Sequence, residues 1–81
     1  MGALKVTDYF RVIRVCPDRA IIKDEWIEQV IRHPDREQVQ IDGRIRRWGK
    51  IKDNDHRYLR VILLSDGETD HSAFFDRGYK P

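Results

Sequence analysis

The chain has 81 residues, which is enough for one small domain, and we expect residues 1–81 to form a single unit. Its 16 Lys and Arg side chains against 14 Asp and Glu leave a net charge of +2, and hydrophobic residues make up 40% of the sequence. That apolar share excludes a wholly disordered chain, and no apolar run approaches the roughly 20 residues of a membrane span. With Cys16 as its one cysteine and no secretory leader, the sequence predicts a cytoplasmic protein without disulfides.

The first two predicted elements are a strand and a helix. Tyr9–Val15 is rich in aromatic and β-branched residues, which favours a strand. Pro17-Asp18-Arg19 then predicts a turn, because proline fixes φ and aspartate can bond its own backbone. A helix is expected over about Asp24–Arg32, ending before Pro34. Its apolar side chains recur at i, i+1, i+4 and i+5 and form one stripe: Trp26, Ile27, Val30 and Ile31.

Four strands are predicted after the helix, as an antiparallel meander: Glu37–Ile41, Arg44–Ile51, Tyr58–Leu64 and Thr69–Phe75. Asp42-Gly43 and Asp66-Gly67 separate β-prone segments and are typical of hairpin turns. The predicted fold is therefore α+β, with one main helix packed on a mostly antiparallel sheet of four to five strands, in the order β-α-β-β-β-β. Its expected core is apolar: Trp26, Ile27, Val30, Val39, Ile45, Leu59, Val61 and Leu63.

The first hairpin favours a three-residue loop over residues 41–43, with Gly43 in the left-handed conformation. Val39 then lies opposite Ile45, and the helix covers the face that carries these two residues and Ile51. The other face is polar apart from one tryptophan: Gln38, Gln40, Arg44, Arg46, Trp48 and Lys50. Arg47 does not fit this alternation and indicates a second bulge.

The second hairpin can be closed by two kinds of loop, and the choice decides whether two side chains meet. A two-residue turn at Asp66-Gly67 places Arg60 and His71 on the same face of the sheet. A three-residue loop places them on opposite faces. The pattern of residues favours neither loop.

Basic residues concentrate in the second half of the chain. Residues 44–60 contain seven Lys and Arg and two Asp. Such a stretch is either a solvated sheet face or a phosphate-binding surface. For the second case we expect RNA binding by Arg44, Arg46 and Lys50, with Trp48 as a stacking surface for an unpaired base.

If the protein cleaves RNA, the expected catalytic residues are His71, Arg60 and Arg77. RNA cleavage needs an acid or base, which His71 would supply, and cations that stabilise the phosphorane, which the arginines would supply. The alternatives are structural: His71 packs on the sheet, and Asp76 pairs with Arg77 at the end of the last strand. The three histidines lack metal-ligand spacing and no Gly-rich phosphate loop is present, so we expect no metal and no cofactor.

The order and spacing of several motifs between Tyr9 and Arg77 resemble a family of small bacterial proteins that is common in cyanobacteria. The main motifs are Glu25-Trp26-Ile27, Gln40 to Arg46, Trp48-Gly49, Tyr58 to Val61, Asp66 to Thr69 and Ala73 to Arg77. That family is remotely similar to the RelE-like and BrnT-like toxins of toxin–antitoxin pairs. The resemblance implies a helix packed on an antiparallel sheet and an mRNA-cleaving toxin held by a small antitoxin protein. RelE-like toxins usually begin with two helices, whereas a strand at Tyr9–Val15 leaves one.

Two functions are therefore expected from the sequence. One is a RelE-like ribonuclease toxin that acts on RNA through a basic sheet face. The other is a non-catalytic module that binds RNA or a protein partner through the same face. Neither involves a membrane, and the residues do not select between them.

Overall fold

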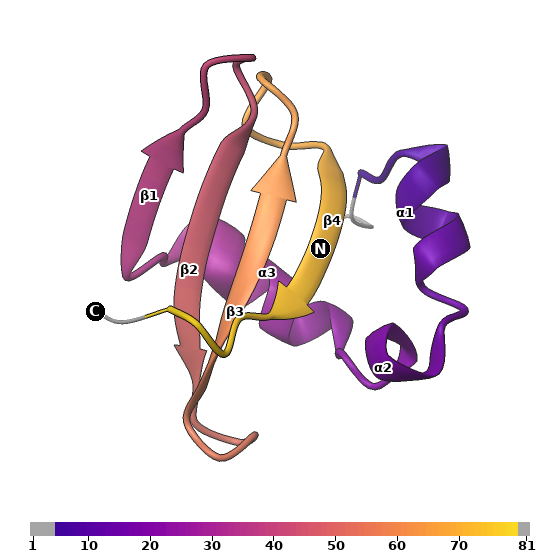
Figure 1. Ribbon diagram of the computed structural model, residues 1–81, viewed down its shortest axis with the longest axis vertical. Helices are drawn as coiled ribbons and strands as arrows, with labels where there is room; N and C mark the ends of the chain where they lie inside the picture. Colours follow the sequence, from indigo (N-terminus) through magenta and orange to yellow (C-terminus); the bar gives the residue numbers. More distant parts are fainter. Residues whose placement is uncertain (1–4, 80–81) are drawn as a thin grey trace.

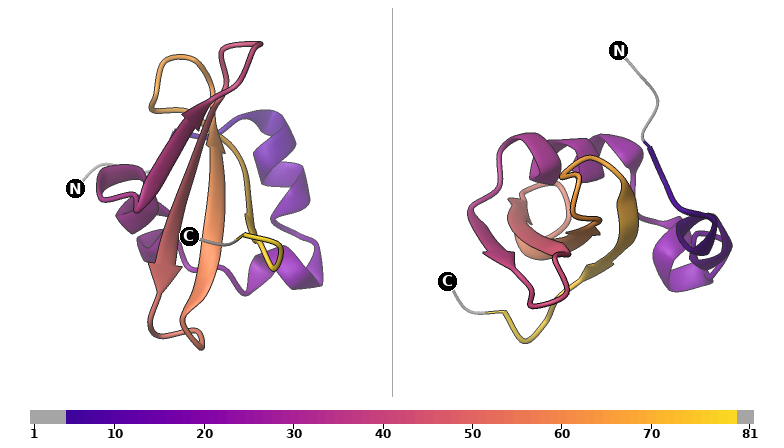
Figure 2. Two further views of the ribbon diagram at one scale, coloured as in Figure 1. Left: turned by 60° about the vertical axis from the view of Figure 1, so that its left-hand side comes forward. Right: turned by 90° about the horizontal axis from the view of Figure 1, so that it is seen from above.

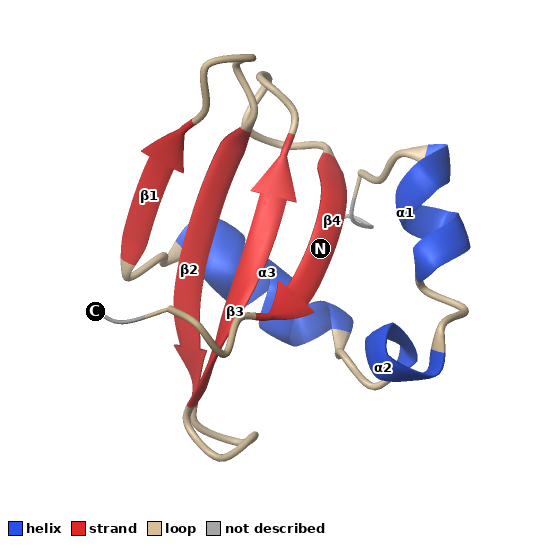
Figure 3. Cartoon of the chain, viewed as in Figure 1, coloured by secondary structure: helices blue, strands red, loops and turns tan. Residues whose placement is uncertain are grey.

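The computed structural model describes residues 5–79, which form three helices followed by a four-stranded sheet (Figure 1). The helices are α1 (Asp8–Ile13), α2 (Pro17–Ala20) and α3 (Asp24–Arg32). The strands are β1 (Arg36–Val39), β2 (Ile45–Ile51), β3 (Arg57–Leu63) and β4 (Asp70–Phe75), and they lie antiparallel in chain order (Figure 3). The predicted α+β class, the helix over Asp24–Arg32 and the four-stranded meander are confirmed.

The segment predicted as a first strand, Tyr9–Val15, is not a strand: residues 9–13 belong to α1 and residues 14 and 15 form a turn, so that prediction was wrong. Thr7 caps α1, because its hydroxyl accepts a hydrogen bond from the N–H of Phe10 at 3.1 Å. Asp8 adds a negative charge in the first turn. Phe10 and Ile13, three residues apart, lie on the side of the helix that faces the core. The cap and this spacing outweigh the strand propensity of the residues between them.

The helices occupy two places around the sheet. α3 lies behind the sheet in the view of Figure 1, whereas α1 and α2 lie beside β4 (Figure 2). The motif predicted as a turn after residue 15 opens α2, with Pro17 in the first turn, where its missing N–H costs no hydrogen bond. The chain after β4 crosses the face of the sheet opposite α3, which we call the outer face.

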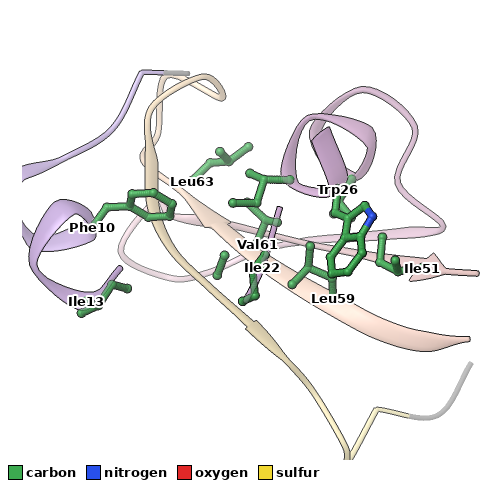
Figure 4. Packing of buried hydrophobic residues seen from close by; sticks show 11 residues of the cluster. Phe10, Ile13, Ile22, Trp26, Ile51, Leu59, Val61 and Leu63 are labelled. Atoms are coloured by element: carbon green, nitrogen blue, oxygen red, sulfur yellow. The ribbon is translucent and has the colours of Figure 1, made fainter. Parts of the chain in front are cut away.

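One apolar core fills the space between α3 and the sheet, and α1 closes it on the side of β4 (Figure 4). The prediction that Val39 belongs to the core was wrong, because this side chain is 63% exposed on the edge strand β1. Ile45 is partly buried and packs against the core. α3 approaches β2 so closely that a Cβ atom on Gly49 would lie 2.8 Å from Cγ2 of Val30.

The first hairpin has the predicted register. Val39 pairs with Ile45, and Gly43 has a φ of 92°, in the left-handed region. No bulge occurs at Arg47, whose side chain points to the helix side of the sheet. Its guanidinium donates to the carbonyl of Ile31 at 2.8 Å and pairs with Glu37 at 2.6 Å. These two partners explain a cation on the face that carries the core.

The second hairpin has a four-residue loop followed by a bulge. Leu64 bonds to Thr69 across the loop at 2.9 Å. The hydroxyl and amide of Thr69 and the amide of Glu68 donate to Asp66 and lower the pKa of its carboxyl to about 2. A register shift between Ile62 and Leu63 then changes the pairing of β3 with β4. Next to the loop, the pairing of Leu63 with Asp70 has the parity that a two-residue turn would give. Beyond the bulge, the pairing of Ile62 with Ser72 has the parity that a three-residue loop would give.

Candidate RNA-binding face

The outer face of the sheet carries most of the polar residues predicted to share it. Alternation along β1, β2 and β3 places the following side chains there: Arg36, Gln38, Arg46, Trp48, Lys50, Tyr58 and Arg60. Arg46 binds the side-chain oxygen of Gln40, a neutral partner that leaves its charge uncompensated. Arg44 lies in the turn before β2, where it pairs with Asp42 at 3.7 Å. The structure therefore brings Arg46 and Lys50 together on one face and holds Arg44 at its margin.

Trp48 is covered by the chain that follows β4. Its ring stacks on that of Tyr79, with centroids 5.2 Å apart and planes 18° apart, and only 6% of Trp48 is exposed. The ring of Tyr79 also contacts that of Tyr58 at 4.7 Å. Trp48 cannot itself receive a base in this arrangement. The two tyrosines form the accessible part of the aromatic cluster.

Arg60 and His71 have separate environments. Arg60 pairs with Asp76 at 3.0 Å and lies 4.4 Å from the ring centroid of Phe74, its partner on β4. His71 is the additional residue of the bulge, and contacts the N-terminal segment instead. The contacts of its ring are a hydrogen bond of Nδ1 with the Thr7 hydroxyl at 3.1 Å and a stack with Tyr9 at 4.8 Å. The structure does not bring the predicted catalytic pair together.

The ion pair predicted between Asp76 and Arg77 is replaced by another. Asp76 binds Arg60, and the same oxygen accepts a hydrogen bond from the indole N–H of Trp48 at 3.1 Å. Its other oxygen accepts from the amide of Gly78 at 3.1 Å. Arg77 is thus left exposed at the end of β4.

A pocket of about 470 Å³ lies where β3 begins and β4 ends, and we call it the tyrosine pocket. It is lined by Arg57, Tyr58, Phe75, Asp76, Arg77 and Tyr79. Within residues 5–79, the guanidinium groups of Arg57 and Arg77 have no hydrogen-bond or ion-pair partner. Two uncompensated cations beside two aromatic rings can bind a phosphate group and stack a base.

Arg57 is the residue of this pocket that the sequence did not single out. The pairing of Leu59 with Phe75 brings the start of β3 beside the end of β4, and only this pairing places Arg57 in the same pocket as Arg77. A tyrosine in a small domain is usually a packing residue, so neither Tyr58 nor Tyr79 stands out in the sequence as a binding residue. The signal available in the sequence was the concentration of basic residues alone.

Metal and membrane sites have no support in the described part of the chain. Residues 5–79 contain no group of three or more His, Cys, Asp or Glu side chains placed to hold a metal ion. No helix there is long and apolar enough to cross a membrane. Comparisons with protein-family models, with curated proteins and with solved structures found no match. The outer face and its pocket are therefore the features of this chain that bear on its function.

Proposed function

We propose that the protein binds single-stranded RNA through the outer face of its sheet, with the tyrosine pocket as the main contact. The observation that carries this proposal is that Arg57 and Arg77, whose guanidinium groups have no partner among residues 5–79, line one pocket together with Tyr58 and Tyr79. An unpaired base can stack on an aromatic ring, whereas a base within a duplex cannot reach one. A single strand is therefore the form of nucleic acid that fits.

The rest of the outer face extends the cationic surface away from the pocket. Lys50 pairs with Tyr58 across β2 and β3, and its ammonium group lies 5.8 Å from the tyrosine ring centroid. Arg46 and Arg36 follow on the same face towards the edge of the sheet. A strand that leaves the pocket would meet these cations at its phosphates. RNA rather than DNA is chosen because the resemblance of the sequence is to toxins that act on RNA, and such a ligand fits a cytoplasmic protein.

RNA cleavage is not part of the proposal. It would require His71 and Arg60 at one phosphate, but Arg60 is bound by Asp76 and His71 by Thr7. The function that we propose is the non-catalytic alternative, and the antitoxin partner implied by the resemblance stays a prediction.

The test is binding of a labelled 12-nucleotide RNA, measured by fluorescence anisotropy between 50 and 200 mM salt. Each phosphate contact adds about 0.7 to the slope of log K against log salt for a single strand. Replacing both Arg57 and Arg77 by alanine should weaken binding at least tenfold and lower this slope by about one to two units. The matched control is Arg11→Ala with Arg32→Ala, two exposed arginines on the helices.

An equal loss in the two double variants would mean that net charge alone drives binding, and it would contradict the pocket. Absence of binding by the wild-type protein at 50 mM salt would refute the whole proposal. The same RNA, run on a denaturing gel after incubation, should stay intact. Cleavage that disappears in a folded His71→Ala variant would restore the ribonuclease hypothesis.

A further inference from the structure

Asp70, at the start of β4, is an aspartate without exposure to water. Its relative exposure is 0%, and neither carboxyl oxygen has a hydrogen-bond partner among residues 5–79. A buried carboxylate without partners is strongly destabilised, so the side chain is favoured in its neutral, protonated form. An aspartate at this position therefore destabilises the folded protein, and it is not part of the proposed RNA-binding face.

The backbone of Asp70 holds the N-terminal segment on the edge of β4. Its N–H donates to the carbonyl of Lys5 at 2.7 Å, and its carbonyl accepts from the N–H of Thr7 at 3.0 Å. Val6 thereby forms a parallel bridge with Asp70. We call residues 5–13, which comprise this bridge and α1, the N-terminal strap. Figure 1 shows the strap lying beside β4, outside the four-stranded sheet.

The strap also covers His71. Thr7 bonds to the imidazole Nδ1, and the ring of Tyr9 stacks on the imidazole at 4.8 Å. Phe10 and Ile13 of the strap pack in the core. The same segment thus depends on Asp70 for its backbone contacts and limits access to the histidine next to it.

Charged groups around Asp70 do not compensate its carboxylate. Arg14, at the end of α1, is already bound to Asp24 at 2.9 Å and to the carbonyl of Ile22 at 2.8 Å. On the strap itself, Lys5 pairs with Glu68 at the surface. Burial raises the pKa of Asp70 to about 8, and the nearby amide of Ser72 and the charge of Arg14 lower it by less.

We propose that Asp70 makes attachment of the N-terminal strap pH-dependent: the strap is held most firmly in acid and is released increasingly as the pH rises, which uncovers His71. With the strap closed, Asp70 keeps its proton. Once the strap is open, water reaches the carboxyl, which then ionises with its ordinary pKa of 3.8. The opening equilibrium therefore favours the open form tenfold more for each pH unit between about 4 and 8, and changes no further above that range.

The test is amide hydrogen exchange of the full chain, followed by NMR at pH 5, 6 and 7 and corrected for intrinsic rates. The amides of Thr7 and Asp70 report on the strap, and those of the β2–β3 ladder report on global unfolding. Protection of the strap amides should fall about tenfold per pH unit. It should be lower than that of the ladder and should depend less steeply on urea between 0 and 1 M, because opening of the strap exposes less surface than global unfolding does.

Two variants separate Asp70 from His71, a second titratable group that the strap covers. Asp70→Asn keeps the shape of the side chain without its proton equilibrium, and Asp70→Leu serves if the buried amide prevents folding. In either variant the protection of the Thr7 amide should become independent of pH. A slope that persists in these variants, or strap amides that exchange only with the ladder, would overturn the proposal.

Discussion

Asp76 is the single residue on which the outer face depends most. Its carboxylate binds the guanidinium of Arg60, the indole N–H of Trp48 and the amide of Gly78. These donors come from β3, β2 and the chain after β4, so one side chain joins three segments. Tyr79 lies three residues after Asp76 and directly after Gly78, whose amide Asp76 binds. The position of the tyrosine pocket therefore depends on Asp76 without requiring it to touch a ligand.

Replacing Asp76 by alanine should lower the free energy of unfolding by about 2–3 kcal/mol, because Arg60 would be left without its carboxylate at a site where its side chain is only 20% exposed. Urea denaturation followed by tryptophan fluorescence measures the effect, since Trp48 loses a hydrogen bond in the same variant. Asp76→Asn, which keeps an acceptor, should lose less. Equal losses in the two variants would show that the hydrogen-bond acceptor is not what matters.

At the scale of elements, local structure is predictable where the sequence contains a turn motif or a clear hydrophobic period. Gly43 follows Asp42 and takes the left-handed conformation that its hairpin needs, so the register of β1 with β2 was predictable. The stripe over Asp24–Arg32 identified α3. α1 was missed because the N-cap at Thr7 lies outside the segment whose composition favours a strand.

The bulge between β3 and β4 could not be predicted from the sequence. A bulge adds one residue without a distinctive residue type, and here the additional residue is His71. The bulge moves every later side chain of β4 to the opposite face of the sheet. The sequence alone therefore did not decide whether Arg60 and His71 share a face. The hydrogen bonds of Asp66 lengthen the loop to four residues, and no turn motif states this in advance.

The contact of α3 with β2 requires glycine at position 49. Gly49→Ala should lower the free energy of unfolding by about 1–3 kcal/mol, since its Cβ would lie 2.8 Å from Cγ2 of the fully buried Val30. Thermal or urea denaturation measures the loss. In a Val30→Ala background the methyl group that causes the clash is absent, so the same substitution should cost much less. An unchanged cost there would place the strain elsewhere.

At the scale of the whole molecule, the sequence located the basic half of the chain but not the pocket. Arg57 and Arg77 lie twenty positions apart, and only the antiparallel pairing of β3 with β4 brings them to one end of the sheet. Trp48 was the stacking candidate, yet Tyr79 covers it. Long-range assembly of this kind depends on register and on the path of the chain after β4, neither of which a residue pattern states.

The stability of the whole protein should depend on pH in a direction opposite to common acid denaturation. Because burial raises the pKa of Asp70 from 3.8 to about 8, the folded protein keeps a proton that the unfolded chain releases above about pH 4. The free energy of unfolding should therefore fall by about 1.4 kcal/mol per unit between pH 4 and pH 8, and level off above. The total over these four units, about 6 kcal/mol, is large for a small domain.

Urea denaturation at pH 5, 6, 7 and 8 measures this profile, and Asp70→Leu provides its control. The leucine variant has no buried carboxyl to ionise, so its stability should lack the slope and should exceed that of the wild type by a margin that grows with pH. Below pH 4 the dependence of stability on pH reverses. The pKa of Asp66 is lowered to about 2 in the folded protein, so the unfolded chain takes up this proton at a higher pH than the folded protein does. The free energy of unfolding therefore falls as the pH drops from about 4 to 2. Stability should thus pass through a maximum near pH 4. A wild-type profile that is level between pH 5 and pH 8, or one that the leucine variant reproduces, would mean that Asp70 is ionised and bound by partners in the folded protein.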